Sequence, residues 1–460
     1  MSKLSHPNTG LEGARPFPGM SLINKNAAGL DIGAHEIMVC VSGPDNTQLV
    51  RSFGNYTIDL YAIAKWLNEY GVETVAMEST GIYWIPLFEV LETHHFHCLL
   101  ISSRSLRRVP GRKSDVVDAQ WIQTLHTYGL LTSSFRPEGD LVALRTLLRH
   151  RAGLLEHRSP HILHMQKALL QMNLQLSQVI TDITGETGLR IIRAIVNGER
   201  DPHQLAGMRD RHCKKNEDDL AKALTGTWRQ EHVFVLGQAL ELYDFYTEKI
   251  DQCDAQIQKT YSVIHPNWEL SEMSNETAPQ HFAPKRLAKN APKDGKEIRV
   301  ALKRICGVDL VQVHGFSVSL AQTIISEIGT DMSKFPNEKH FCSWLGLAPK
   351  NDISGGKVLI SRTLKTRNRA GQAFRLAAVS VMRADCAFGA FYRRMKSRLG
   401  PAQATVATAH LMARIVYRML KYHIEFEPLN VAEYERHYQE QQVKYLERKA
   451  AKFGFQLAPA

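Results

Sequence analysis

Residues 29–53 read GLDIGAHEIMVCVSGPDNTQLVRSF, and this stretch decides the fold of the N-terminal part of the chain. Three runs rich in apolar residues, at 29–33, 37–42 and 48–53, are separated by turn-forming residues such as the Gly-Pro-Asp-Asn at 43–46. Such short, closely spaced runs predict three consecutive strands that pair as an antiparallel meander.

After the meander, helical patterns alternate with strand patterns. Hydrophobic periodicity predicts helices at 58–70 and 84–92, strands at 74–78 and 97–101, and a further helix from about residue 114. This order is typical of the ribonuclease H-like fold, so we expect an α/β domain of that class at 27–137. Residues 1–26 are rich in Pro, Gly, Ser and Asn and predict a disordered lead-in.

The rest of the chain is predicted to be mostly helical. We expect a helical coiled-coil region, a polar linker, a serine-bearing domain, and a charged C-terminal helix with its tail, at 138–262, 263–296, 297–428 and 429–460. The coiled coil rests on residues at alternating spacings of three and four: Leu236, Ala239, Tyr243, Tyr246, Ile250, Cys253 and Ile257. Their partner is either the preceding helical run, which Ser159-Pro160 divides into 141–157 and 161–179, or another protomer.

The charge balance favours a polyanionic partner. Lys and Arg number 57 against 46 Asp and Glu, which gives a net charge of +11 and a pI of about 9.2. The seven cysteines are scattered without zinc spacing and are typical of reduced thiols. Neither a signal-peptide run nor an apolar stretch of membrane-spanning length occurs, so we expect a cytoplasmic protein without membrane contact.

Four acidic residues are expected to meet at one end of the predicted sheet. Asp31 interrupts the first strand, and Glu78 ends the fourth, which neighbours the first in this fold. Asp115 and Asp118 lie three apart at a helix start and therefore share one helix face.

Clustered carboxylates repel one another, and a hard divalent cation such as Mg²⁺ or Mn²⁺ compensates them. Taken singly, each acid is better explained without catalysis, Asp115 as a helix-capping residue and Glu78 as a solvated acid at a strand end. Taken together, the four favour a metal-binding catalytic set that acts on phosphodiesters. Basic residues just before the second acidic pair suit a phosphate backbone, although a solvated loop is the alternative: Arg104, Arg107, Arg108, Arg112 and Lys113.

A second candidate site is the segment Ser354-Gly355-Gly356-Lys357. Glycines let the backbone approach a phosphate, and a serine placed there could attack phosphorus. The motif alone is more often a simple turn, but the segment that it opens carries one acid, Asp385, and eleven basic residues: Lys357, Arg362, Lys365, Arg367, Arg369, Arg375, Arg383, Arg393, Arg394, Lys396 and Arg398. We expect the first six of these to bind nucleic acid.

Four separated motifs resemble those of bacterial insertion-sequence transposases with an Asp-Glu-Asp-Asp tetrad, the insertion-sequence "one-ten" family. They are GLDIG at 29–33, MESTG at 77–81, KSDVVDA at 113–119, and SWLGL with ISGGK between 343 and 357. The resemblance implies a RuvC-like domain, a coiled-coil insertion, and a mostly helical transposase domain with a catalytic serine. It assigns the tetrad to Asp31, Glu78, Asp115 and Asp118, and the serine to Ser354.

The resemblance further implies a DNA recombinase guided by an element-encoded bridge RNA, with a 5′-phosphoserine link to DNA. It also implies a homo-oligomer, a dimer or tetramer, in which tetrad and serine come from different protomers. Two other functions stay open: a Holliday-junction-type endonuclease in which the tetrad activates water, and a non-catalytic nucleic-acid-binding protein. The assignment of the four acids follows from the predicted fold and from their chemistry, whereas the assignment of Ser354 as nucleophile depends mainly on the resemblance.

Overall fold

The computed structural model describes residues 17, 19–43, 47–79, 81–101, 115–136, 139–265, 289–363, 368–428 and 430–458, without the side chains of 115–117 and 352. The chain divides into two compact units, Met1–Arg136 and Pro137–Ala460, called unit 1 and unit 2 below. Unit 1 is a mixed α/β structure, and unit 2 is mostly helical.

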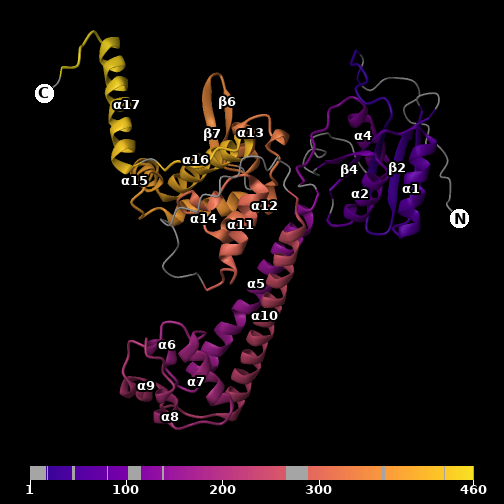
Figure 1. Cartoon of the computed structure of the whole chain (residues 1–460). Coiled ribbons are helices and arrows are strands. Elements are labelled where there is room, and N and C mark those ends of the chain that lie inside the picture. Colours follow the sequence, from indigo (N-terminus) through magenta and orange to yellow (C-terminus); the bar gives the residue numbers. More distant parts are fainter. Residues whose placement is uncertain are drawn as a thin grey trace. The chain divides into compact units, whose positions relative to one another are not determined.

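Unit 1 is built on a five-stranded sheet with the strand order β3-β2-β1-β4-β5 (Figure 1). The strands are Ala27–Ile32, Ile37–Ser42, Gln48–Phe53, Thr74–Glu78 and His97–Ile101 for β1 to β5. β2 pairs antiparallel with β1 and with β3, while β4 is parallel to β1 and to β5. The meander and the neighbouring first and fourth strands are as the sequence predicts.

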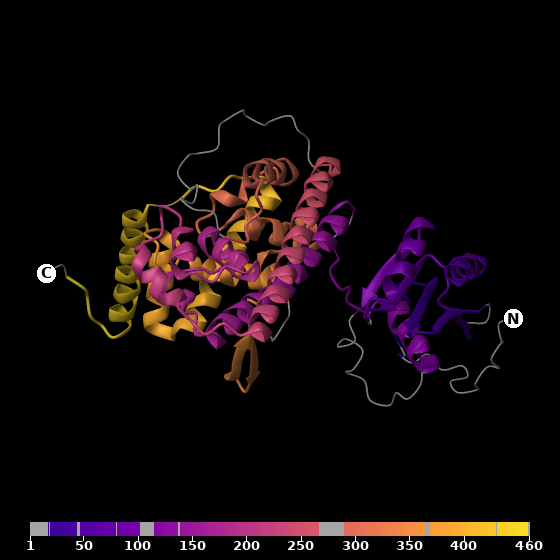
Figure 2. The same ribbon diagram turned by 90° about the horizontal axis from the view of Figure 1, so that it is seen from below.

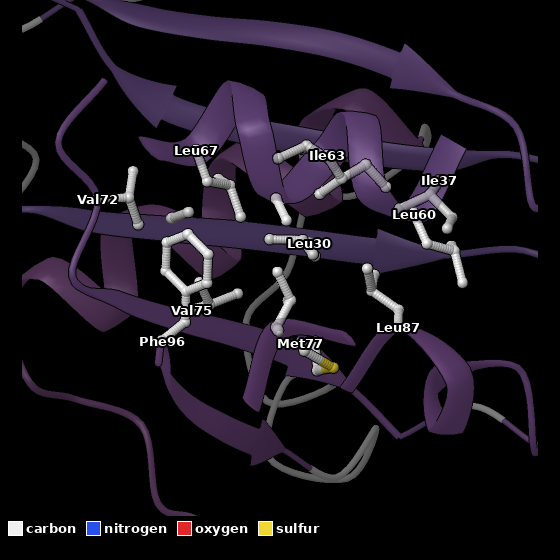
Figure 3. Packing of buried hydrophobic residues seen from close by; sticks show 14 of the residues in the cluster. Leu30, Ile37, Leu60, Ile63, Leu67, Val72, Val75, Met77, Leu87 and Phe96 are labelled. Atoms are coloured by element: carbon white, nitrogen blue, oxygen red, sulfur yellow. The ribbon is translucent and has the colours of Figure 1, made fainter. Parts of the chain in front are cut away.

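Helices cover both faces of this sheet. Helices α1 (Thr57–Glu69) and α2 (Trp84–Thr93) bury their apolar sides against one face, where Leu30, Ile63 and Met77 are fully buried (Figure 3). Helix α4 (Asp115–Thr127) covers the other face with Ala119, Ile122 and Leu125. Because strand side chains alternate between faces, the face on which a residue lies follows from its position in the strand.

Part of the predicted disordered lead-in contacts helix α4. The Phe17 ring lies edge-on to Tyr128, with ring centroids 5.2 Å apart. The backbone N–H groups of Ile23 and Asn24 donate to the carbonyl of Thr127 over 2.9 and 3.0 Å. The end of the lead-in therefore covers the C-terminal end of α4.

Unit 2 begins with two long antiparallel helices, α5 (Leu141–Gln171) and α10 (Gln230–Val263), which run side by side in both views (Figures 1 and 2). The seam residues of α10 predicted from their spacing are buried against α5, except the half-buried Tyr246, which stacks on His157 and His161. Of the two partners considered for this seam, the preceding helix of the same chain covers it.

The predicted break at Ser159-Pro160 is wrong, because α5 continues through Pro160. Proline cannot donate to the carbonyl of Glu156, but both residues are exposed, so solvent can reach that carbonyl. The adjoining turns are held by packing on α10, where Met165 and Ala168 are fully buried. Tertiary packing thus overrides the local preference of the sequence.

Two groups of short helices complete unit 2. A lobe at one end of the α5–α10 pair consists of α6 (Leu176–Val179), α7 (Glu186–Val196), α8 (Pro202–Gly207) and α9 (Glu217–Leu224). The C-terminal part consists of α11 (Gly295–Cys306), α12 (Val318–Ile328), α13 (Glu338–Trp344), α14 (Arg369–Ser380), α15 (Ala387–Leu399), α16 (Pro401–Tyr422) and α17 (Val431–Lys452), with 3-10 turns at Leu310–Gln312 and Met332–Lys334. Residues 266–288, most of the predicted polar linker, lie outside the described residues.

A buried carboxylate joins α5 to the C-terminal part. Glu327 of α12 is 5% exposed and accepts hydrogen bonds from Arg149 at 2.8 and 2.7 Å and from Arg145 at 3.0 Å. Burial alone would raise the pKa of Glu327, but the hydrogen bond from Arg149 and the charges of Arg145, Arg149 and Arg369 lower it below its ordinary value. The carboxylate therefore stays ionised and fixes α12 against α5.

An unpredicted β-hairpin projects from the helical C-terminal part (Figure 1). Strands β6 (Pro349–Ser354) and β7 (Lys357–Thr363) pair antiparallel around the two-residue turn Gly355-Gly356. Both glycines have positive φ, of 55° and 74°, as a type I′ turn requires. No helix among the described ranges is both long and apolar enough to cross a membrane.

Candidate active site

Asp31 and Glu78 lie at the carboxyl ends of adjacent parallel strands of unit 1, Asp31 as the next-to-last residue of β1 and Glu78 as the last of β4. The register pairs Leu30 of β1 with Met77 of β4, so the next residues along, Asp31 and Glu78, lie side by side. Leu30 and Met77 point into the core beneath α1 and α2, and alternation therefore turns both acids to the face that α4 covers. Both carboxylate residues are only partly buried. Two of the four predicted acids thus share one edge and one face.

Helix α4 approaches this face at backbone contact distance, and Gly29 is the reason. A Cβ atom at Gly29 would lie 2.1 Å from the backbone nitrogen of Gln123 and 2.5 Å from the carbonyl oxygen of Ala119. Any side chain at residue 29 would therefore force sheet and helix apart. Asp31 lies two residues further along the same face of β1, about 7 Å from Gly29.

The direction of α4 places its acidic first turn near the two strand ends. Its last residue, Thr127, bonds to Ile23 and Asn24 before β1, while Ala119 lies over Gly29. The helix therefore runs antiparallel to β1, and its N-terminal turn lies toward the edge that holds Asp31. Asp118, partly buried, is one residue before Ala119. Asp115 is the first residue of α4, and its side chain lies outside what the structure describes.

Polar side chains fix α4 along the sheet. Gln48 of β3 donates to the Gln123 Oε1 atom at 2.8 Å and to the Gln120 carbonyl at 3.0 Å. The Gln123 amide, itself 4% exposed, donates to the Ser42 hydroxyl at 2.8 Å. A slide of α4 along β1 would break these bonds, so they hold its first turn in place.

The C-terminal end of α4 is fixed by a buried histidine. The His126 ring lies 2.9 Å from the Thr74 hydroxyl and is 4% exposed. Burial lowers the pKa of His126 to about 4, so the ring is neutral near pH 7. This residue is structural, because it lies at the opposite end of α4 from the acids.

The described side chains do not by themselves close a metal site. Within the part of the chain that the structure describes, no three His, Cys, Asp or Glu side chains form a group that could hold a metal ion. The side chain of Asp115, which belongs to the predicted set, lies outside the described residues and is not part of that statement. The donor chemistry fits Mg²⁺ or Mn²⁺, since carboxylate oxygens are ligands that these hard cations prefer.

Ser354 lies at the tip of the β6–β7 hairpin in unit 2. It is the last residue of β6, it is exposed, and it pairs with Lys357 across the Gly355-Gly356 turn. The glycine turn expected from the sequence is therefore the turn of a hairpin, and Ser354 lies at the end of the first hairpin strand. Tetrad and serine belong to different units.

Two family models match the chain at these two places. A model described as a transposase, of the IS110 type with the DEDD signature, matches residues 28–174. A second, described as Transposase IS116/IS110/IS902 family, matches residues 309–393. The chain belongs to the IS110 family of insertion-sequence transposases. Comparison with curated proteins finds no match.

The transposase is accordingly a DNA-cutting and DNA-rejoining enzyme of insertion-sequence mobility, with DNA as its substrate. The first matched segment contains all four predicted acids, and the second contains Ser354 and the whole hairpin. The DEDD signature agrees with a dependence on divalent metal.

The predicted nucleic-acid-binding residues of the transposase fall into three groups. One group lies outside the described residues: Arg104, Arg107, Arg108, Arg112, Lys113, Lys365 and Arg367. Lys357, Arg362 and Arg369 are exposed. Arg375 is half-buried and donates to the Gly346 carbonyl at 2.7 Å, and burial lowers its pKa, so it has a structural task in the chain.

The sequence pattern does not reveal the residues that position α4. Gly29 lies in a predicted strand, and glycine inside a strand often marks close approach of another backbone. Gln48 and Gln123 gave no signal, because their partners lie 72 to 81 residues away in sequence. The hairpin, in contrast, has a signal in the sequence. A Gly-Gly pair followed by the β-branched and apolar residues of 358–360 predicts a two-residue turn between strands.

Proposed function

We propose that the transposase cuts and rejoins DNA by transesterification at Ser354, assisted by a divalent metal ion at Asp31, Glu78, Asp115 and Asp118. The observation that supports the proposal is that Asp31 and Glu78 lie side by side on the sheet face covered by α4, in a chain that also presents an exposed serine at a hairpin tip. The acids and the serine form two half-sites that must be brought together, between protomers of a dimer or tetramer.

The proposed reaction balances without an added oxidant or reductant. The Ser354 hydroxyl oxygen bonds to phosphorus, the bond from phosphorus to the 3′ oxygen breaks, and a 5′-phosphoserine forms. The serine proton passes through solvent to the departing 3′ oxygen. Attack by a new 3′ hydroxyl reverses the step and rejoins the strand. A bound Mg²⁺ or Mn²⁺ would supply charge stabilisation of the phosphoryl oxygens.

Each of the chain's own groups has a defined task in this proposal. Asp31 and Glu78, fixed at adjacent strand ends, would hold the metal on its sheet side, and Asp115 and Asp118 would hold it on the helix side. Gly29 and the Gln48–Gln123 bonds would set the distance between the two sides. The exposed hairpin allows Ser354 to reach a DNA strand held by another protomer.

We further propose that an RNA encoded by the element pairs with donor and target DNA and selects the sites. The net charge of +11 supports binding of a second polyanion. In this proposal the DEDD domain comprises 27–137, the helical insertion 138–262 and the serine-bearing domain 297–428. Sequencing of the RNA that co-purifies with the protein tests guidance: recovery of one element-encoded species supports it, and recovery of only random cellular RNA contradicts it.

The mechanism is tested by trapping the covalent intermediate. Purified protein with its co-purified RNA is incubated with supercoiled DNA that carries the element ends, denatured, and assayed for protein attached to a 5′ end. Wild type should give the adduct, and Ser354→Ala should abolish it. Ser361→Ala, an exposed serine of the same hairpin, is the matched control and should leave it unchanged.

Two outcomes would overturn parts of this proposal separately. If Ser354→Ala still cuts DNA and no adduct forms, the tetrad activates water as in a junction endonuclease, and the serine mechanism is wrong. If Asp31→Asn cuts DNA at the wild-type rate and without divalent metal, the tetrad assignment is wrong.

A further inference from the structure

The β6–β7 hairpin has two chemically different faces. Its cross-strand pairs place residues opposite one another on the same face, and the register fixes which residues share it. Lys350 pairs with Arg362, and Ser354 pairs with Lys357. Lys350 and Ser354 are four residues apart in β6, so alternation puts both pairs on one face. The pair between them, Asp352 with Ile360, belongs to the same face. We call the face that carries Lys350, Ser354, Lys357 and Arg362 the serine face; its three cations outnumber its one acid.

A bulge in β7 is what brings Lys357 to the serine face. Asp352 pairs with Ile360, and the next residue, Ile353, pairs with Val358, so Leu359 is the extra residue of β7. Without this extra residue, the alternation of β7 would be shifted by one, and Lys357 would lie on the face opposite Arg362. The bulge therefore determines the face of the hairpin on which the charge of Lys357 lies.

The opposite face is apolar near the tip. Ile353 and Val358 face each other across the strands and are 62% and 54% exposed. All the basic residues of the hairpin lie on the serine face, although the ribbon is exposed on both sides. Solubility alone does not require that arrangement, because charge on either face would serve it.

The cations of the serine face lie at two places. Lys350 and Arg362 are directly opposite each other, and both residues are exposed. The Ser354–Lys357 pair lies four residues along β6, about 13 Å away, which is roughly the rise of four nucleotides along one DNA strand. The two basic positions could therefore contact separate phosphates of one strand.

We propose that the serine face is a DNA-phosphate clamp, in which Lys357 holds the phosphate beside Ser354 while Lys350 and Arg362 hold a phosphate further along the same strand. The clamp deepens the proposed function and rests on it for the identity of the reacting phosphate. Lys357 is then a positioning residue of the reaction, and the hairpin binds its strand before the half-sites meet.

The test uses the salt dependence of DNA binding, which counts phosphate contacts without requiring chemistry. Full-length protein is titrated with a fluorescent duplex of the element end between 50 and 200 mM salt. Each lost phosphate contact reduces the slope of log K against log salt by about 0.9, which is about a 3.5-fold smaller change in affinity over this range. Because the clamp contacts two phosphates, the triple variant Lys350→Ala, Lys357→Ala, Arg362→Ala should lose about 1.8 of slope, a change of about 12-fold.

A matched control moves one charge to the other face. Lys357→Ala combined with Val358→Lys keeps the net charge but places the cation on the apolar face, so it should behave like Lys357→Ala alone, whereas Lys357→Arg should keep the wild-type slope. A triple variant with the wild-type slope overturns the clamp, as does recovery in the charge-moved variant or a slope change seen with RNA but not with DNA.

Failure of the clamp can be separated from failure of the serine mechanism. Ser354→Ala should keep the wild-type salt slope while it abolishes the covalent adduct. If Ser354→Ala still forms an adduct, the assignment of Ser354 as nucleophile is wrong, but the clamp proposal is unaffected. If the triple variant keeps the wild-type slope and forms the adduct normally, only the clamp proposal is wrong.

Discussion

Replacing Gly29 with alanine is expected to separate the two sides of the carboxylate site. The added Cβ would meet backbone atoms of α4 at 2.1 to 2.6 Å, whereas ordinary contact begins at 3.4 Å. Helix and sheet must therefore move apart by about 1.3 Å, the difference between 3.4 and 2.1 Å. These α4 atoms all belong to the backbone of Ala119 and Gln123 and not to a flexible side chain, so the whole of α4 must shift.

Two magnitudes follow from this displacement. Overpacking of a tight interface costs about 1–3 kcal/mol, which would lower the Tm of unit 1 by about 4–12 °C. A misplacement of about 1 Å in a catalytic arrangement can slow a reaction about a hundredfold, so DNA cleavage should fall by that factor. The loss of rate should persist at 20 °C, where the variant is still folded.

The assay pairs the initial rate of DNA cleavage with thermal unfolding followed by circular dichroism. Gly153→Ala in α5 is the matched control, because nothing lies within 4 Å of a Cβ built there. It should keep the wild-type rate and gain up to about 1 kcal/mol of stability from improved helix propensity. Cleavage by Gly29→Ala within threefold of wild type would refute the view that the contact between α4 and β1 sets the active geometry.

Three further predictions concern stability. His126, whose pKa burial lowers to about 4, contributes fully above about pH 6.5 and loses its contribution as the pH falls toward 4, so unit 1 should lose about 3 kcal/mol in this window. Hydrogen exchange of unit 1 against pH checks this, and His126→Gln should flatten the profile. Glu327→Gln should destabilise unit 2 by about 1–3 kcal/mol in urea unfolding, less than for a fully buried pair because Arg145 and Arg149 are partly exposed. Since the pKa of Glu327 is lowered, its contribution to stability is present above about pH 4.5 and is lost as the pH falls below this, so the variant should lack this part of the acid sensitivity of the wild type. Pro160→Ala should stabilise unit 2 by up to about 3 kcal/mol in the same urea assay, and an unchanged midpoint would mean that the helix bends there without strain.

The sheet of unit 1 was predictable because its signals are local. Strands β2 to β5 follow the apolar runs with their predicted limits, and the edge that carries Asp31 and Glu78 follows from the order of strands. Apolar runs bounded by turn residues leave few alternatives over such short segments.

The features that failed prediction depend on contacts between distant residues. Pro160 marks a break by local rules, but burial of the following turns against α10 keeps α5 continuous. Glu327 gave no sign that it would bind two arginines nearly 180 residues away. The face on which Lys357 lies depends on one extra residue in β7, which alternation alone does not locate.

The ion pair between Glu327 and α5 also affects how motion is transmitted along α5. Helix α5 is 31 residues long, about 46 Å, and it is clamped to α12 near one end while the α6–α9 lobe packs on the other. A tilt of about 5° at the clamp would swing the lobe by about 4 Å, given that length. A small change in the tilt of α5 at the C-terminal part therefore becomes a larger displacement of the lobe. Conversely, a force applied by a molecule bound to the lobe acts on the Glu327 ion pair through a long lever arm.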